Sequence, residues 1–237
     1  IHRANIHKAS AAGPTLDALG DLPTSLHSLL LGRLDRLTDH QQASLKVASV
    51  VGREFRTEWV AACQAGATEK DAEATFEATG AVGLTDRLSA KPSVHEFNHA
   101  ITHEVAYESQ SHADRTRLHT ALARFVETKV ATPDEPHLDL LAHHYWLGDD
   151  PDKARAYLRA AGTAAQSAYA NQAALLYLGR LLELQDGSAR LPTLLDIGEV
   201  ESFVGQYAAA EKHLTEALEL AQQANSPAEE AGARRRR

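Results

Sequence analysis

The chain has 237 residues, a formal net charge of -8 at pH 7 and 43% hydrophobic residues. This length is enough to bury a core, and we interpret the pattern below as two domains. The negative charge opposes non-specific attraction to nucleic acid and to anionic lipid. Cys63 is the only cysteine, which excludes an internal disulfide and a thiolate metal cage, and we expect this thiol to be a small core residue.

The sequence carries no targeting or membrane-spanning signal. It has no run of about 18 apolar residues, and its N-terminus lacks the apolar segment and cleavage site of a signal peptide. We therefore predict a soluble, cytoplasmic protein without membrane contact. The sequence has no methionine, even at position 1, which we interpret as the sign of a piece of a longer protein. The arginines at 234–237 are interpreted as a truncated helix or processing scar, with a nucleic-acid arm as the alternative.

The first part of the chain predicts a linker and then a helix. Residues 1–21 are rich in small and polar residues and show weak periodicity, so we interpret them as a linker. After Pro23, which the first turn of a helix tolerates, leucines recur at helical spacing. A helix is therefore expected to follow Pro23 directly.

Three helix starts are predicted from the residues that could cap them. Thr38 and Gln41 match a capping box, in which each side chain satisfies a free backbone N–H at the start of the helix. Thr57 and Thr68 are the next N-cap candidates. The two helices that they would open cover residues 57–64 and 68–79.

A hairpin is predicted after these helices. The segments 82–88 and 94–97 have strand-like composition and flank a turn-forming stretch that contains Pro92. Three helices followed by a hairpin are the element order of a winged helix. We therefore assign residues 22–112 to a winged-helix-like domain with a preceding helix.

The second part of the chain, residues 113–237, predicts helices joined by short turns, with a repeat at an offset of 36 residues. The equivalent positions are Gly162 and Gly198, Ala174 and Ala210, and Leu178 and Leu214. Small residues at such positions let two antiparallel helices approach closely. The second unit fits the tetratricopeptide (TPR) pattern, and a looser echo lies upstream. The predicted fold is therefore mainly α, with a winged helix followed by a TPR-like α-solenoid.

Three segments resemble bacterial signalling ATPases of the STAND type: Leu22–Leu37, Ala48–Phe55 and Phe97–Ser109. In that family an AAA-like ATPase domain is followed by a winged helix and TPR repeats. These parts are often attached to a class III adenylate or guanylate cyclase or to a LuxR-type DNA-binding domain. The resemblance implies that a nucleotide-binding domain precedes this chain in the parent protein, and that ATP or ADP and Mg bind there.

The chain departs from the whole-protein pattern because it has no Gly-x-x-x-x-Gly-Lys-Ser/Thr loop to hold phosphates. We therefore predict that this part is not an enzyme and has no catalytic residue or cofactor of its own. The resemblance suggests one nucleotide contact. His99 follows the predicted wing, where related STAND proteins place a histidine against the phosphate of bound ADP. The alternative is a buried histidine that caps a helix over residues 99–109.

His95, Glu96 and His99 match the His-Glu-x-x-His motif of zinc metalloproteases. That chemistry needs both histidines on one face of a helix and a third ligand. The segment is predicted to be the second strand of the hairpin, so we predict no metal site and keep a zinc-dependent hydrolase as a remote alternative. His99 and His103 are a second possible metal pair, for which we favour a structural interpretation.

DNA binding is not expected through the presumed recognition helix. That helix has four acidic residues and one basic residue: Glu69, Lys70, Asp71, Glu73 and Glu77. The acids would repel phosphates. A later basic group is interpreted as a solvated helix face, with contact to an acidic partner surface as the alternative: Arg115, Arg117 and Arg124 with His119.

These observations favour a non-catalytic regulatory and protein-interaction region of a multidomain signalling ATPase. In this hypothesis the winged helix docks on the upstream ATPase domain of the same chain, and the TPR-like repeats bind a protein or peptide ligand. The alternatives are a plain TPR-like scaffold without nucleotide coupling and the zinc-dependent hydrolase.

Overall fold

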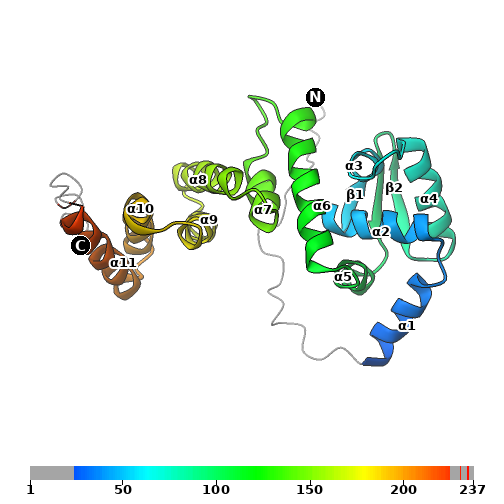
Figure 1. The fold of residues 1–237 in the computed structure, drawn as a ribbon, viewed down its shortest axis with the longest axis horizontal. Coiled ribbons are helices and arrows are strands. Elements are labelled where there is room, and N and C mark those ends of the chain that lie inside the picture. The colour runs from blue at the N-terminus through cyan, green and yellow to red at the C-terminus, as the bar shows by residue number, and fades with distance from the viewer. Residues whose placement is uncertain (1–23, 225–229, 231–233, 235–237) are drawn as a thin grey trace.

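The computed structural model describes residues 24–224 together with Glu230 and Arg234 (Figure 1). The structure is 72% helical, which confirms the prediction of a mainly α fold. The expected linker over 1–21 and the last three arginines lie outside the described residues. Within the described part, none of the helices has the length and apolar character needed to span a bilayer.

The N-terminal part combines helices with a small sheet. Its elements are α1 (Thr24–Leu34), α2 (Asp39–Val51), β1 (Glu54–Arg56), α3 (Thr57–Ala62), α4 (Glu69–Ala81), β2 (Thr85–Ala90), β3 (Ser93–Phe97) and α5 (Ala100–Glu108). The strands form one antiparallel sheet in the order β1-β3-β2, so the last strand lies in the middle. Helices α2, α3 and α4 pack on one another and on this sheet (Figure 1).

Two of the three predicted helix starts are confirmed. Thr38 closes a full capping box with Gln41 at α2, and Thr68 does the same with Asp71 at α4. The third prediction is wrong, because Thr57 is the first residue of α3 and its N-cap is the preceding arginine. The cause is strand β1, which the periodicity did not predict. This strand leads directly into α3, so the chain is already extended where the helix begins.

The predicted hairpin is present as β2 and β3, with β2 starting three residues later than expected. Its inner face packs on aromatic rings. The Phe55 ring of β1 lies 4.6 Å from that of Phe76 in α4 and 5.3 Å from that of Phe97 in β3, measured between centroids. All three rings are buried, so the sheet and α4 share one core.

The C-terminal part is a succession of helices. They are α6 (His112–Phe125), the π-helical turn η2 (Val126–Val130), α7 (Leu138–Leu147), α8 (Pro151–Ser167), α9 (Asn171–Glu183), the short 3-10 turn η3 (Gly187–Ala189), α10 (Arg190–Phe203) and α11 (Tyr207–Gln223). From α6 to α11, each α-helix packs against the next one in the chain. Figure 1 shows this row of helices leading away from the N-terminal part.

One hydrophobic cluster continues across the predicted domain boundary at residue 112. It contains Leu45 of α2, Val60 of α3, Leu122 of α6 and Tyr145 of α7. Helix α6 therefore packs on α2 and α3 as well as on α7. The boundary itself stays a prediction, but the apolar side of α6 belongs to the core of the N-terminal part.

The 36-residue repeat appears in the contacts inside two helix pairs, α8 with α9 and α10 with α11. A Cβ atom added to Gly162 would lie 2.9 Å from Leu178 Cδ2, and one added to Gly198 would lie 2.6 Å from Leu214 Cγ. Both contacts are closer than carbon atoms normally approach. Each glycine is therefore needed, because the facing leucine fills the space that a side chain would take.

The turns inside these two pairs also share their backbone geometry. The N–H of Tyr169 donates to Gln166 O at 3.0 Å, and 36 positions later the N–H of Gly205 donates to Ser202 O at 3.2 Å. Tyr169 and Gly205 both have positive φ angles, 55° and 80°. The sequence repeat therefore corresponds to a repeat in the backbone.

The first prediction concerns the close contact in the second pair. Gly198→Ala should destabilise α10 and α11 by about 1–3 kcal/mol, because the new methyl group overlaps Leu214. Gly179→Ala is the matched control, since Gly179 lies inside α9 and an added Cβ would meet nothing within 4 Å. The free energy of unfolding of that variant should instead rise by about 0.5–1 kcal/mol, because alanine lowers the backbone entropy of the unfolded chain.

Urea unfolding and amide hydrogen exchange measure both effects. Because each pair contacts mainly its neighbours, protection lost in Gly198→Ala should be concentrated in residues 190–223 and spare residues 38–97. Equal loss in both regions would show that the chain unfolds as one cooperative unit and would contradict the repeat interpretation.

Candidate functional site

The His-Glu-x-x-His segment does not lie on a helix. His95 and Glu96 belong to β3, and His99 is the N-cap residue of α5. The His95 side chain is only 1% exposed and packs against the rings of Phe55 and Phe76. His99 is exposed. The two histidines therefore lack the shared helix face on which the zinc motif depends.

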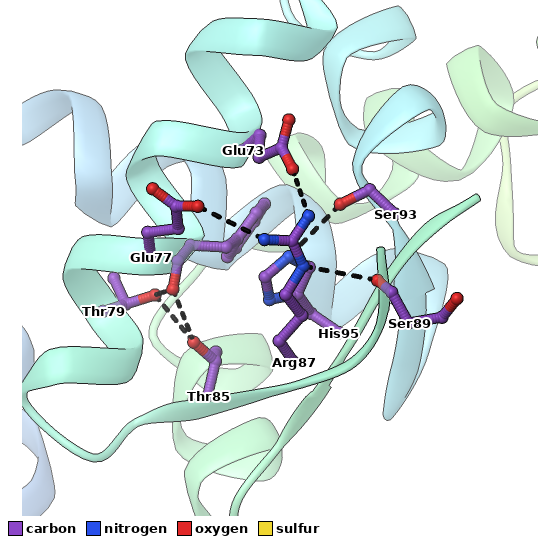
Figure 2. A network of polar contacts seen from close by, with 9 residues as sticks. Glu73, Glu77, Thr79, Thr85, Arg87, Ser89, Ser93 and His95 are labelled. Carbon is purple, nitrogen blue, oxygen red and sulfur yellow. Dashed lines mark hydrogen bonds and ion pairs between the residues drawn. The ribbon is translucent and has the colours of Figure 1, made fainter. Parts of the chain in front are cut away.

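A polar network surrounds His95 and ties the hairpin to α4, as Figure 2 shows. Arg87 of β2 forms ion pairs with Glu73 and Glu77 of α4. Ser93 Oγ lies 3.5 Å from His95 Nε2. Burial, together with the nearby Arg87 charge, lowers the pKa of His95, so this ring is neutral at pH 7.

The histidines of the two possible metal pairs have separate environments in the structure. His103 Nε2 lies 2.9 Å from Ser49 O and so fastens α5 to α2, while the exposed His99 makes no side-chain cap for its helix. The alternative of a buried capping histidine is therefore wrong: His99 is the N-cap residue, but its side chain is exposed and forms no capping hydrogen bond. Within residues 24–224, no three His, Cys, Asp or Glu side chains are grouped so that they could hold a metal ion.

A cavity of about 640 Å³ lies between α2, the turn from α3 to α4 and the start of α6. Lys46, Arg117 and Asp114 bring charges of both signs to its lining. Cys63 also lines it; this residue is half-buried and packs against the main hydrophobic core, so the expectation of a core residue holds in part. Burial raises the pKa of this thiol to about 12, so it is not a reactive nucleophile at neutral pH.

Three hydrogen-bonding side chains link α5, α6 and α7. The Tyr107 hydroxyl lies 2.9 Å from His119 Nε2, and His119 Nδ1 lies 2.7 Å from His144 Nδ1. Both histidines are 2% exposed. The expectation that His119 lies on a solvated helix face is therefore wrong, because this side of α6 is covered by α7.

The proton positions in this cluster are linked. Only one proton fits between the two Nδ1 atoms, so one imidazole donates and the other accepts. If His119 donates to His144, its Nε2 must accept from Tyr107, and if His119 accepts, its Nε2 donates to Tyr107. Burial, and then the charges of His143 and Arg115, lower the pKa of His119 to about 3. Burial lowers the pKa of His144 well below 6.5.

A second polar cluster ties η2 to α7 and α8. The Glu127 carboxylate accepts hydrogen bonds from the hydroxyls of Tyr145, at 2.5 Å, and Tyr157, at 2.7 Å, and forms an ion pair with Lys153. The two tyrosine rings stack with centroids 5.3 Å apart. Burial alone would raise the pKa of Glu127, but these donors outweigh it and lower the pKa. Together the two clusters hold the first C-terminal helices in a fixed arrangement.

The second prediction is a loss of stability in mild acid. The unfolded histidines have a pKa near 6.5, and the folded pKa values of His119 and His144 are lower, so the unfolded chain binds more protons below pH 6.5. The stability of the fold is therefore fully present above about pH 6.5 and falls as the pH is lowered toward about 3. The loss is up to about 1.4 kcal/mol per pH unit for each group.

Thermal unfolding at about pH 7.5 and about pH 4.5 compares the wild type with His144→Gln, which removes one titrating ring. Between the two pH values, the melting temperature of His144→Gln should fall by less than that of the wild type. The control is His112→Gln, which changes an exposed histidine at the start of α6 and should behave like the wild type. An identical acid shift in all three proteins would show that the buried cluster does not set this dependence.

The third prediction concerns zinc. We expect dialysed protein to contain no stoichiometric zinc, and chelator to leave the melting temperature unchanged in both the wild type and His99→Ala. His99 is chosen because its exposed side chain can be removed without disturbing the core. One zinc ion per chain in the wild type, absent from His99→Ala, would instead establish a metal site at this segment.

Comparisons with known proteins give no further guide. No protein-family model, no curated protein and no solved structure matches this chain. A functional conclusion therefore has to come from the residues themselves, from the repeated helix pairs and from the clusters that join them to the N-terminal part.

Proposed function

We propose that the chain is the regulatory and protein-interaction region of a larger signalling ATPase. Residues 22–112 act as a winged helix that docks on an upstream ATPase domain, and residues 113–237 act as TPR-like repeats that bind a protein or peptide ligand. The observation that carries the repeat part of this proposal is the 36-residue period, which is present in the sequence, in the glycine–leucine contacts and in the turns. The ATPase part is supported by the sequence resemblance. Stacked helix pairs of this kind serve as binding surfaces.

The joints between the helices support a relay from the repeats to the N-terminal part. The Tyr107–His119–His144 cluster and the Glu127 cluster connect α5 through α8. Further along, Arg159 of α8 donates to Asp196 of α10 at 2.8 Å. A ligand on the repeats can bias the parent between two states only through a difference in its affinity for those states. In this proposal the hydrogen-bonded clusters between the helices transmit the effect of ligand binding on the repeats to the ATPase domain.

The surface of α4 favours an intramolecular role over DNA binding. Glu73 and Glu77 are paired with Arg87 of the hairpin, so the acidic side of α4 is used to hold the hairpin. The remaining acids near the start of this helix would repel phosphates. DNA is therefore not part of the proposed function.

In the proposed parent protein, ATP or ADP with Mg belongs to the ATPase domain and not to this chain. His99 is the candidate contact to that nucleotide, and its exposure at the N-cap of α5 leaves the ring accessible to a docked domain. The proposed role of His99 is to sense the nucleotide. No residue of this chain is proposed to be catalytic.

The fourth prediction tests the coupling. In a protein that joins the ATPase domain to this chain, ADP and a non-hydrolysable ATP analogue should give different amide protection over residues 38–112. His99→Ala should reduce that difference without changing the melting temperature. The chain alone should bind neither nucleotide in calorimetry, because it lacks a phosphate loop.

Micromolar affinity of the isolated chain for ATP would contradict the assignment of the nucleotide to another domain. Identical protection with both nucleotides would remove the coupling and leave a plain helical-repeat scaffold.

A further inference from the structure

The buried pair of His119 and His144 lies in the contact between α6 and α7, and α7 belongs to two hydrophobic clusters. One cluster contains residues of α7 together with α6 and the N-terminal part, and the other continues from α7 into α8, α9 and α10. Residues 131–137, between η2 and α7, form no helix. The contact between α6 and α7 can therefore loosen while the helices on either side keep their own packing.

At neutral pH a single proton lies between the two rings of this pair. His119 Nδ1 and His144 Nδ1 are 2.7 Å apart, and His119 Nε2 is engaged by the Tyr107 hydroxyl. One additional proton would place a charge on rings that are only 2% exposed. A second would set two N–H groups face to face, and neither could accept a hydrogen bond from the other. The closed contact therefore excludes the doubly protonated pair.

The groups nearest the pair would oppose additional positive charge. Arg115 of α6 lies over the Tyr107 ring, 5.0 Å from its centroid. The His143 ring of α7 lies against both rings of the pair, with centroids 6.0 Å and 5.0 Å away. His143 in turn faces Arg180 of α9 and Asp139 of its own helix. Within the described residues, no charged side chain of α2, α3 or α8 hydrogen-bonds to either ring of the pair.

The carboxylates at this joint are bound elsewhere. Asp149 accepts a hydrogen bond from Thr120 at 2.7 Å, and Glu127 is held by two tyrosines and Lys153. Burial opposes the charge of Glu127, but its donors lower the pKa overall, so this carboxylate keeps its charge in mild acid. Mild acid therefore acts on the histidine pair, while the Glu127 cluster continues to hold η2 on α7 and α8.

We propose that the His119–His144 pair is a proton-operated switch in the contact between α6 and α7. The contact is closed at neutral pH and opens in mild acid, when each ring takes up one proton from water. Opening exposes both rings, so that water solvates the two imidazolium groups. The helices stay attached to each other through the Glu127 cluster. This inference rests on the proposed relay and names the proton as its regulator.

The test follows the Cε1–H signals of the histidines by NMR in the full chain, as the pH is lowered from about 7.5 to about 4. His119 and His144 should titrate together with a slope of about two protons, because both rings become accessible in the same opening. The midpoint should lie between the pKa of about 6.5 of an ordinary histidine and the pKa of about 3 of closed His119. Amide protection over 38–97 and 190–223 should persist at that midpoint.

Two matched variants identify the source of the slope. His144→Asn places an amide close to the position of Nδ1, so it can still hydrogen-bond to His119 but does not titrate. The slope for His119 should then fall from about two protons to about one. His112→Asn makes the same change at an exposed histidine of α6 and should leave the slope at about two. The wild-type slope needs no variant, so it tests the proposal even if His144→Asn does not fold.

The inference is overturned if the two rings titrate independently or if they stay neutral down to about pH 4. It is also overturned if they protonate only where amide protection is lost over 38–97 and 190–223 as well, because that result is global unfolding. None of these results bears on nucleotide coupling in the joined protein, since the test contains no nucleotide. Paired protonation without nucleotide coupling would keep the switch and remove the relay.

Discussion

Helix α6 packs on α2 and α3 of the N-terminal part and also on α7 of the C-terminal part, and the rest of the structure depends on this constraint. Its apolar residues complete the core of α2 and α3, while the same helix packs on α7. His119 lies in that second contact, where a charged ring would be costly to desolvate. The hydrogen-bonded cluster of Tyr107, His119 and His144 satisfies these polar groups without a charge. The N-terminal part and the repeats are therefore joined through packing and not through a free linker.

Features that depend on neighbouring residues in the sequence could be predicted. The capping boxes at Thr38 and Thr68 involve residues three positions apart, and the repeat depends on small residues at a fixed spacing. Strand β1 could not be predicted in the same way. It has only three residues, and its extended form is set by pairing with β3, whose residues lie about 40 positions later. The same strand accounts for the missed N-cap at Thr57.

Less of the candidate sites than of the fold could be predicted from the sequence. The strand assignment of His95 was predicted, but its burial between aromatic rings depends on α4 and β1. The contact between His119 and His144 joins residues 25 positions apart on two helices, and no spacing rule indicates it.

The equal spacing of the two glycine–leucine contacts has a consequence for the evolution of the chain. Gly162 with Leu178 and Gly198 with Leu214 give the two helix pairs, here called modules, the same close contact at the same spacing. Because such modules contact mainly their neighbours, duplication or deletion of one whole module would leave a matched junction behind. We therefore expect that descendants of a common ancestor differ by whole modules. Insertions that are not a whole module would misplace a glycine against its leucine, and selection would remove them.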